Sequence, residues 1–318
     1  MLNWLFLIGG LVLLIKGSDW FVEGSSNVAK AFKIPSLIIG LTIVAFGTSA
    51  PEAAVSISAA LKGNANVAIG NVIGSNIFNL LMVVGVASCF KRLSVDKDII
   101  KRDYPFNMLV TLVIMFMVFD KLLDGYNTMS ISRSDGLVLL CFFAIYMYYL
   151  IAGALGQRQN MTFEEPTRSM GTSILFLLVG LGCVIAGGQF TVDGACGIAR
   201  DLGVSENMIA LTIVAAGTSL PELVTSVTAV RKGESDIAVG NVIGSNIFNL
   251  LFILGAAAAI SPLNAAPTVL TDSLFLVISN AVVYGFILKN KSTAKKSGSL
   301  MIVMYIAFAV YVVIRGIA

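Results

Sequence analysis

The sequence LTIVAFGTSAPE at residues 41–52 recurs as LTIVAAGTSLPE at residues 211–222, and GNVIGSNIFNLL at 70–81 recurs unchanged at 240–251. The two copies of each string lie 170 residues apart, and the same offset aligns the first residues of the chain without a gap. The chain is therefore built from two related halves. Polar and acidic residues are the best-preserved part of this very apolar sequence, which indicates that the duplication serves a site made of them.

The composition indicates a membrane protein. Of the 318 residues, 57% are hydrophobic and only 12% are charged, and the mean hydropathy is +0.90. A soluble domain carries about twice that fraction of charge. A transmembrane helix needs about 20 mostly apolar residues to cross about 30 Å of hydrocarbon. Ten apolar runs meet or approach this length: 2–26, 36–61, 67–90, 104–119, 136–155, 171–199, 206–230, 237–260, 269–288 and 300–314.

The distribution of positive charge predicts the topology. Connectors on the cytoplasmic side of a membrane protein collect Lys and Arg. Here most of the 21 Lys and Arg residues lie in the connectors after the first, third, fifth, seventh and ninth runs. The opposite side holds only Lys62, Lys121, Arg133, Arg200 and Arg315. This bias predicts ten transmembrane helices in the cell membrane, with both termini extracellular.

Five helices in each half is an odd number, so the second half enters the membrane inverted relative to the first. We expect a first five-helix repeat at 1–155, a cytoplasmic linker at 156–170 and a second, inverted repeat at 171–318. The predicted fold class is an all-α polytopic membrane protein. The net charge of +3 comes from the connectors and does not indicate a nucleic-acid partner, and no obligate protein partner is evident.

The repeated GTS-x-PE motif predicts a break in two membrane helices. Pro51 and Pro221 lack an N–H and clash with the carbonyl four residues earlier. Carbonyls near 45–48 and 215–218 must then find other partners. Broken helices persist at membrane depth only where they are packed in protein or face a polar cavity. The motif therefore predicts a cavity.

Glu52 and Glu222 follow the two prolines directly, where a lone carboxylate in a membrane costs at least about 2.5 kcal/mol. An inverted repeat brings equivalent positions together near the midplane, so we expect the two glutamates to meet. Two facing carboxylates without a counter-ion repel, and the pair must bind protons or hold a cation. The alternative is a capping box, in which Ser49 or Ser219 and the glutamate three residues later only seal the restarting helix.

The second repeated string supplies further polar groups. Ser75 and Asn79 are four residues apart and share one helical face, as do Ser245 and Asn249. We expect these four side chains to line the cavity. Asn76 and Asn246 point roughly 100° away from that face. The glycines of the string, spaced by four, are typical of close helix packing: Gly70, Gly74, Gly240 and Gly244.

The assembled site offers only oxygen ligands, because the chain contains no histidine and the motifs contain no cysteine. Oxygen ligands suit Ca²⁺ or alkali ions and disfavour zinc or copper. Two glutamates neutralise one Ca²⁺ or two monovalent ions. Either ion can fill such a site, and the two related halves can open it to either side of the membrane. These two properties are the physical basis of exchange. We expect no cofactor, only transported ions.

At these residues the chain resembles the Ca²⁺:cation antiporter superfamily, and within it the prokaryotic relatives of the Na⁺/Ca²⁺ exchangers. The likeness covers the whole chain, and the family's two α-repeats look like residues 41–85 and 211–255. It implies the Na⁺/Ca²⁺ exchanger fold. It also implies ligands for Ca²⁺ or Na⁺: the side chains of Glu52, Glu222 and Asn79, the hydroxyls of Ser49, Ser219, Ser75 and Ser245, and the carbonyls of Thr48, Thr218, Ala45 and Ala215.

Two departures from the family's patterns bear on the coupled ion. Asn249 stands where Na⁺/Ca²⁺ exchangers of this family often carry Asp, so the site lacks a third acid. The GN-x-x-EH signature of H⁺/Ca²⁺ exchangers is absent, because Gly70-Asn71 continues as Val-Ile-Gly-Ser. Exchange of Ca²⁺ for Na⁺ is the prediction. H⁺/Ca²⁺ exchange at the same glutamates is the alternative.

Two other classes of function are less favoured. A passive cation channel usually gains its pore from oligomeric symmetry, whereas an intramolecular inverted repeat fits alternating access. An intramembrane enzyme would need an activated nucleophile, and Ser49 and Ser219 have no histidine partner. Asp19 and Glu23 lie near a membrane face, where we expect solvation at the interface or, as the rival interpretation, a role at the mouth of the ion path.

Overall fold

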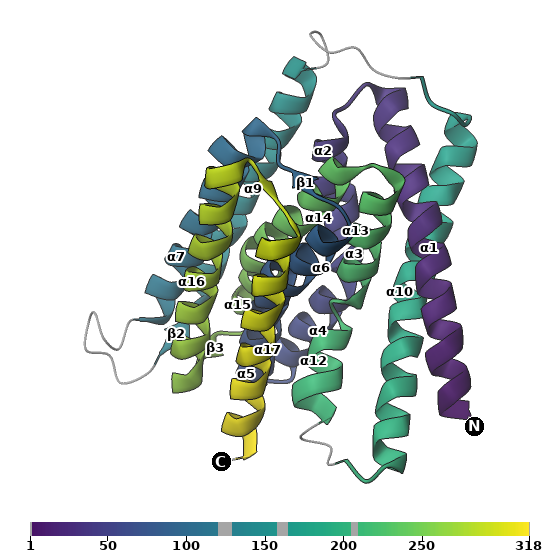
Figure 1. The fold of residues 1–318 in the computed structure, drawn as a ribbon. Coiled ribbons are helices and arrows are strands. Elements are labelled where there is room, and N and C mark those ends of the chain that lie inside the picture. The colour runs from purple at the N-terminus through teal and green to yellow at the C-terminus, as the bar shows by residue number, and fades with distance from the viewer. Residues whose placement is uncertain (1, 120–128, 158–164, 205–208, 318) are drawn as a thin grey trace.

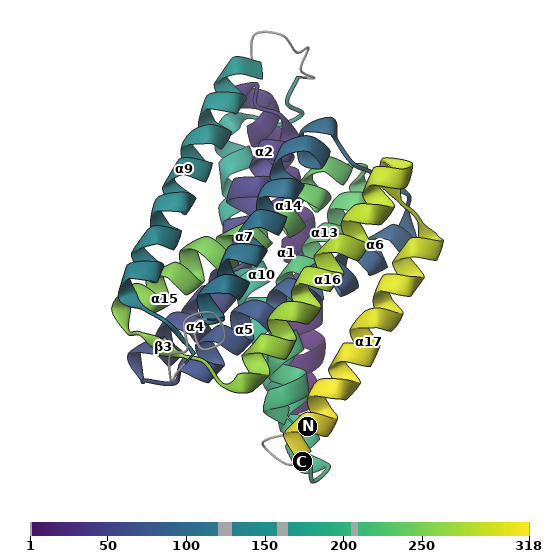
Figure 2. The ribbon, with the colours of Figure 1, turned by 90° about the vertical axis from the view of Figure 1, so that its left-hand side faces the viewer.

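The computed structural model describes residues 2–119, 129–157, 165–204 and 209–317, and these residues are mostly helical. The longest helices run roughly parallel to one another, and shorter helices cross between them (Figures 1 and 2). We call the end of the bundle where α1 begins and α17 ends the terminal end. The opposite end, where α9 finishes and α10 starts, is the linker end.

The first half contains α1 (Leu2–Phe32), α2 (Ser36–Ile39), η1 (Gly40–Val44), α3 (Ala45–Thr48), α4 (Ala50–Leu61), α5 (Ala65–Phe78), η2 (Asn79–Val83), α6 (Val84–Phe90), β1 (Leu93–Ser94), η3 (Ile99–Asp103), α7 (Tyr104–Val118), β2 (Ser130–Ile131) and α9 (Arg133–Gln157). The second half contains α10 (Met170–Asp201), η4 (Ala210–Val214), α12 (Ala215–Gly217), α13 (Leu220–Lys232), α14 (Ser235–Ile247), η5 (Phe248–Ile253), α15 (Leu254–Ile260), β3 (Leu263–Asn264), α16 (Pro267–Asn290), β4 (Ser292–Thr293) and α17 (Lys295–Ile317). The segments written η are π-helical turns, which often occur at functional sites.

Helices occupy the positions of all ten predicted runs. Among the described residues, eight are long and apolar enough to cross a membrane on their own. A ninth span results if the bent pair of segments from Ser36 to Leu61 is counted as one. The helix α7, with 15 residues, is shorter than a full span. The all-helical membrane fold is therefore confirmed, whereas the count of ten stays a prediction.

Two short strand pairs show how the halves are arranged. Leu93 of β1 pairs with Thr293 of β4, and Leu263 of β3 pairs with Ile131 of β2, both antiparallel. Leu93 and Leu263 are equivalent positions of the duplication, yet their strands lie toward opposite ends of the bundle (Figure 1). Equivalent connectors at opposite ends are what an inverted repeat requires.

The helices α1 and α10 stand together on one side of the bundle, while α7, α9 and α16 lie on the other (Figures 1 and 2). Glycines permit the close approach of α1 and α10. A Cβ on Gly187 would lie 2.5 Å from the amide nitrogen of Leu14, and one on Gly10 would lie 2.5 Å from that of Thr191. Small residues at such crossings let membrane helices pack backbone to backbone.

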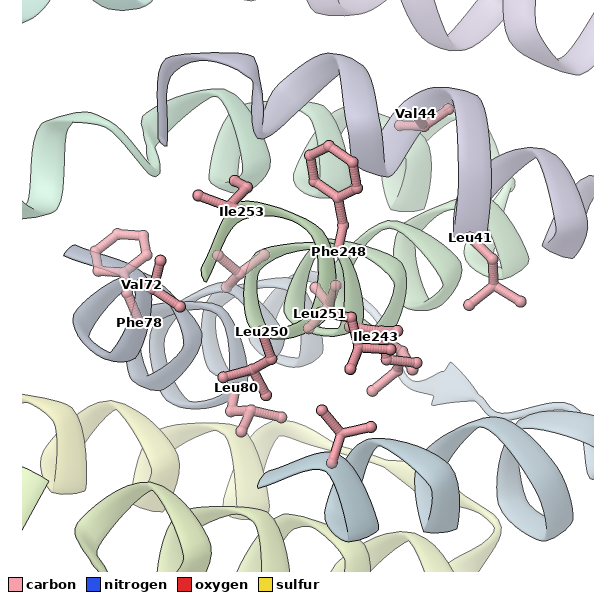
Figure 3. Packing of buried hydrophobic residues seen from close by; sticks show 14 of the residues in the cluster. Leu41, Val44, Val72, Phe78, Leu80, Ile243, Phe248, Leu250, Leu251 and Ile253 are labelled. Atoms are coloured by element: carbon pink, nitrogen blue, oxygen red, sulfur yellow. The ribbon is translucent and has the colours of Figure 1, made fainter. Parts of the chain in front are cut away.

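The centre of the bundle is formed by the second repeated string of each half. The span α14–α15 is the most buried of the long spans, and α17 is the most exposed. One buried hydrophobic cluster joins the two halves there (Figure 3), and its members include Val44, Leu80, Phe248, Leu250 and Leu251. Both copies of the string are thus at the core, and all their polar residues except the partly buried Asn71 are held inside the protein.

Candidate cation site at the meeting point of the two halves

Both GTS-x-PE motifs interrupt a helix, as the sequence predicts. In the first half α3 ends at Thr48 and α4 begins at Ala50, with a bend of 50° between the two segments. In the second half α12 ends at Gly217 and α13 begins at Leu220. A proline lies in the first turn of each restarting helix, where its missing N–H costs no hydrogen bond.

The glutamates of the two motifs are fully buried and are linked across the halves. The Ser219 hydroxyl donates to Glu52 Oε1, and the Ser49 hydroxyl donates to Glu222 Oε1, both at 2.8 Å. Neither serine side chain caps its own helix, so the capping box is not formed. The serines instead bind the carboxylate of the opposite half, which brings Glu52 and Glu222 to one place.

Within the described part of the chain, neither glutamate forms an ion pair with Lys or Arg. The Oε2 atoms of Glu52 and Glu222 are buried and accept no hydrogen bond from any described residue. Burying unpaired negative charge is costly unless a cation compensates it. The carboxylate pair thus has the charge and the free oxygens to hold a cation.

The asparagines of the second string add neutral oxygen ligands. Asn79 and Asn249 are fully buried, and the Oδ1 atom of each accepts no hydrogen bond from the described residues. The Ser75 hydroxyl, one turn before Asn79, lies 3.4 Å from Glu52 Oε1. Carboxylate, amide and hydroxyl oxygens make a ligand set for a hard cation such as Ca²⁺ or an alkali ion. No group of three or more His, Cys, Asp or Glu residues forms a metal cage among the residues described.

The remaining predicted residues are not placed symmetrically. The carbonyl of Ala45 accepts from the Ser245 hydroxyl at 3.3 Å and from the Ser49 amide at 3.0 Å. Its counterpart Ala215 is exposed. The Thr48 hydroxyl donates to Asn241 Oδ1 at 3.0 Å, whereas the buried Thr218 hydroxyl has no partner among the described residues.

Sequence reasoning missed the contribution of four asparagines. Asn71 donates to the Glu52 carbonyl, and Asn241 accepts from Thr48. Asn76 and Asn246, expected to point away from the site, are buried and bind Asn249 and Asn79. Their signal in the sequence was exact repetition: every Asn of GNVIGSNIFN occurs in both copies.

A cavity of about 310 Å³ adjoins the site on the side of the terminal end. It lies between the restarting helix α4, the segment η4–α12 and α10. Its lining includes Pro51, Val55, Gln189, Thr218 and Pro221. The cavity therefore contacts residues of both broken motifs.

Comparisons with known proteins agree with this geometry. The family model described as sodium/calcium exchanger protein matches residues 2–152 and 172–314. The inner membrane protein YrbG of Escherichia coli is 35% identical over 295 residues, which cover 90% of this chain and 88% of YrbG. The sodium/calcium exchanger MaX1 of Methanosarcina acetivorans is 32% identical, with 97% of each chain covered.

A solved structure of the sodium-calcium exchanger NCX_Mj, soaked with Na⁺ and Sr²⁺, superposes with a TM-score of 0.84 at 33% identity. The superposition covers 96% of this chain and 97% of that one. The matched family comprises transporters, not enzymes, and the apolar helices make the protein a multi-pass membrane protein. Since family model and relatives match nearly the entire chain, the chain belongs to the sodium/calcium exchanger family of cation antiporters, within the Ca²⁺:cation antiporter superfamily.

Proposed function

We propose that the protein exchanges Ca²⁺ for Na⁺ by alternating access at the site between the broken helices. The observation that carries the proposal is the crossed pair of buried glutamates. Each is bound by the serine of the other half, and the second oxygen of each accepts no hydrogen bond from the described residues. The proposed ligands are those that the resemblance implies, together with the side chain of Asn249.

The charge of the site explains why the ions compete. Glu52 and Glu222 supply two negative charges, which one Ca²⁺ or two Na⁺ neutralise, whereas the carboxamides of Asn79 and Asn249 add oxygens without charge. An empty pair of charged carboxylates in this buried place is costly. The protein therefore rarely changes between its outward- and inward-facing states while the site is empty. Movement of one ion is thus coupled to movement of the other.

The cavity and the charge bias together suggest the direction in which the site faces. Basic connectors lie at the linker end, so the positive-inside rule makes that end cytoplasmic and puts both termini outside. The cavity next to Pro51 and Thr218 then lies on the outer side of the site. In this proposal the two five-helix repeats, 1–155 and 171–318, are joined by the cytoplasmic linker 156–170 and reorient around the fixed site.

Flux into liposomes tests the proposal. Purified protein should take up radioactive calcium when Na⁺ is loaded inside and diluted outside. Glu52→Gln and Glu222→Gln should each abolish uptake, because either change removes half of the charge that balances Ca²⁺. Glu165→Gln, at an exposed position outside the site, is the matched control and should transport normally.

The counter-ion is decided in the same vesicles. A pH gradient in place of the Na⁺ gradient should not drive uptake, and if it does, the protein is an H⁺/Ca²⁺ exchanger. Uptake that needs no counter-ion would identify a passive channel. Normal uptake by both glutamine variants would show that the glutamates are not the ion ligands.

A further inference from the structure

Four asparagines of the repeated string form one interlocked cluster where α5–η2 meets α14–η5. Asn76, Asn79, Asn246 and Asn249 are all at most 1% exposed. Each side chain binds a residue of the opposite half, so the cluster is crossed in the same way as the serine and glutamate pairs.

Each of the four side-chain NH₂ groups donates one hydrogen bond to the opposite half, in a crossed pattern. Asn76 Nδ2 donates to the Asn246 carbonyl at 3.3 Å, and Asn246 Nδ2 donates to the Asn76 carbonyl at 3.5 Å. These reciprocal bonds fix the orientation of both carboxamides. Each then presents its Oδ1 atom as an acceptor to the neighbouring ligand asparagine.

That acceptor decides which way the ligand asparagines are turned. Asn249 Nδ2 donates to Asn76 Oδ1, and Asn79 Nδ2 donates to Asn246 Oδ1, both at 3.2 Å. With the NH₂ groups held there, the Oδ1 atoms of Asn249 and Asn79 are directed elsewhere and accept nothing from the described residues. Rotating either amide by 180° would direct NH₂ hydrogens at a cation, which repels them.

We propose that Asn76 and Asn246 are positioning residues that orient the carboxamides of Asn249 and Asn79 so that an oxygen, and not an NH₂ group, faces the ion. Mutating a residue that orients a metal ligand without touching the metal typically lowers metal affinity or activity by 10–100-fold. The inference rests on the proposed function, because it assumes that a cation binds beside Asn79 and Asn249. It deepens that function by explaining how a neutral side chain serves in a cation site.

A carboxylate provides the test, because both of its ends are oxygens and it needs no orienting. Asn76→Ala should weaken equilibrium binding of radioactive Ca²⁺ to the purified protein by about 10–100-fold. In an Asn249→Asp background the same change should cost less than about threefold, since the carboxylate presents an oxygen in either orientation. In an Asn79→Asp background the full loss should remain.

The other half gives the matched control. The loss of Ca²⁺ affinity caused by Asn246→Ala should be suppressed by Asn79→Asp and not by Asn249→Asp, because Asn246 binds Asn79. A structural role for Asn76 in packing would instead cost the same affinity in all three backgrounds, and that result would overturn the inference. Thermal unfolding checks that each variant is folded, and Asn76→Leu, close to Asn in shape, replaces Asn76→Ala if the latter does not fold.

The outcomes also separate the two proposals. Wild-type protein that binds no Ca²⁺ refutes the proposed function itself. Wild-type protein that binds Ca²⁺ without the crossed pattern of suppression leaves the function standing and refutes the positioning role.

Discussion

The two halves share their motifs but are packed differently against each other. Toward the linker end, α14 is pressed onto η1, and a Cβ on Gly244 would lie 2.5 Å from the Leu41 carbonyl oxygen. Its counterpart Gly74 in α5 has no described heavy atom within 4 Å of the same position. In the first half the Thr48 hydroxyl donates to Asn241 Oδ1, whereas in the second half Thr218 lines the cavity and its hydroxyl has no partner among the described residues.

This difference does not come from the motifs, which are nearly identical. It accompanies a side-chain contact between α1 and α13 that the equivalent residues of the other half cannot form. Ser18 of α1 lies 3.2 Å from the Thr225 hydroxyl of α13, but the equivalent positions are Gly188 and Val55, which have no side-chain hydrogen bond to offer. The duplicated parts thus carry the residues of the site, and the diverged parts pack differently around the two copies. Three pairs of variants test this comparison.

The largest effect is expected from the glycines. Gly244→Val should lower the melting temperature strongly, because overpacking of a tight contact costs about 1–3 kcal/mol or more. Gly74→Val should melt like the wild type, since no heavy atom of the described residues lies within 4 Å of the added Cβ. It should nevertheless block exchange if the transport cycle brings α5 as close to η4 as α14 now lies to η1.

Thermal unfolding in detergent and calcium flux in liposomes measure the two effects. Exchange at the wild-type rate by Gly74→Val would show that the second side does not close by the packing seen on the first. Equal melting temperatures for the two variants would contradict the described difference in packing.

A smaller effect is expected from the threonines. Thr48→Val removes a buried donor to Asn241 Oδ1, and a buried acceptor left unsatisfied costs about 1–3 kcal/mol. Thr218→Val removes a hydroxyl that has no described partner, so its stability should be close to that of the wild type. Both variants keep the backbone carbonyl. The melting temperatures decide the matter, and an equal loss in both would mean that the two sides are equivalent in solution.

The smallest effect is expected at the linker end of α1. Glu23 pairs with Arg168 and lies 3.5 Å from Lys232 Nζ at the end of α13. Its counterpart Asp193 accepts a hydrogen bond from Gln189 of its own helix. Glu23 is partly exposed, so Glu23→Gln should weaken closure by less than about 1 kcal/mol, or about fivefold.

Separation of α1 from α13 can be followed with a cysteine at position 225 of α13, which faces α1. With the four native cysteines replaced, Thr225→Cys should be labelled a few-fold faster in Glu23→Gln and at an unchanged rate in Asp193→Asn. High salt should narrow the difference, because it screens the ion pairs. Faster labelling in both variants would argue against a one-sided closure.

Much of the fold was predictable, because membrane helices are chosen by local hydrophobicity and the duplication is visible as repeated letters. The breaks at Pro51 and Pro221 followed from the missing N–H, and the meeting of Glu52 with Glu222 followed from inverted symmetry. The role of Asn76 was not predictable from its helical face. Asn76 lies about 100° around the helix from Ser75, and this rotation directs it toward the second half of the molecule. Helical spacing alone does not reveal which residues of that half lie beside it.

The sequence by itself determined the class of protein, the two halves and the oxygen-only chemistry of the site, because these depend on residue types and spacing. The tertiary structure alone decided which buried oxygens accept no hydrogen bond from the described residues, and how tightly each copy of the motifs is packed. Ser49 could cap its own helix or bind Glu222, and it binds Glu222 because the other half brings that carboxylate within 2.8 Å. Two nearly identical motifs take up unequal surroundings for the same reason: the neighbours that pack against them differ.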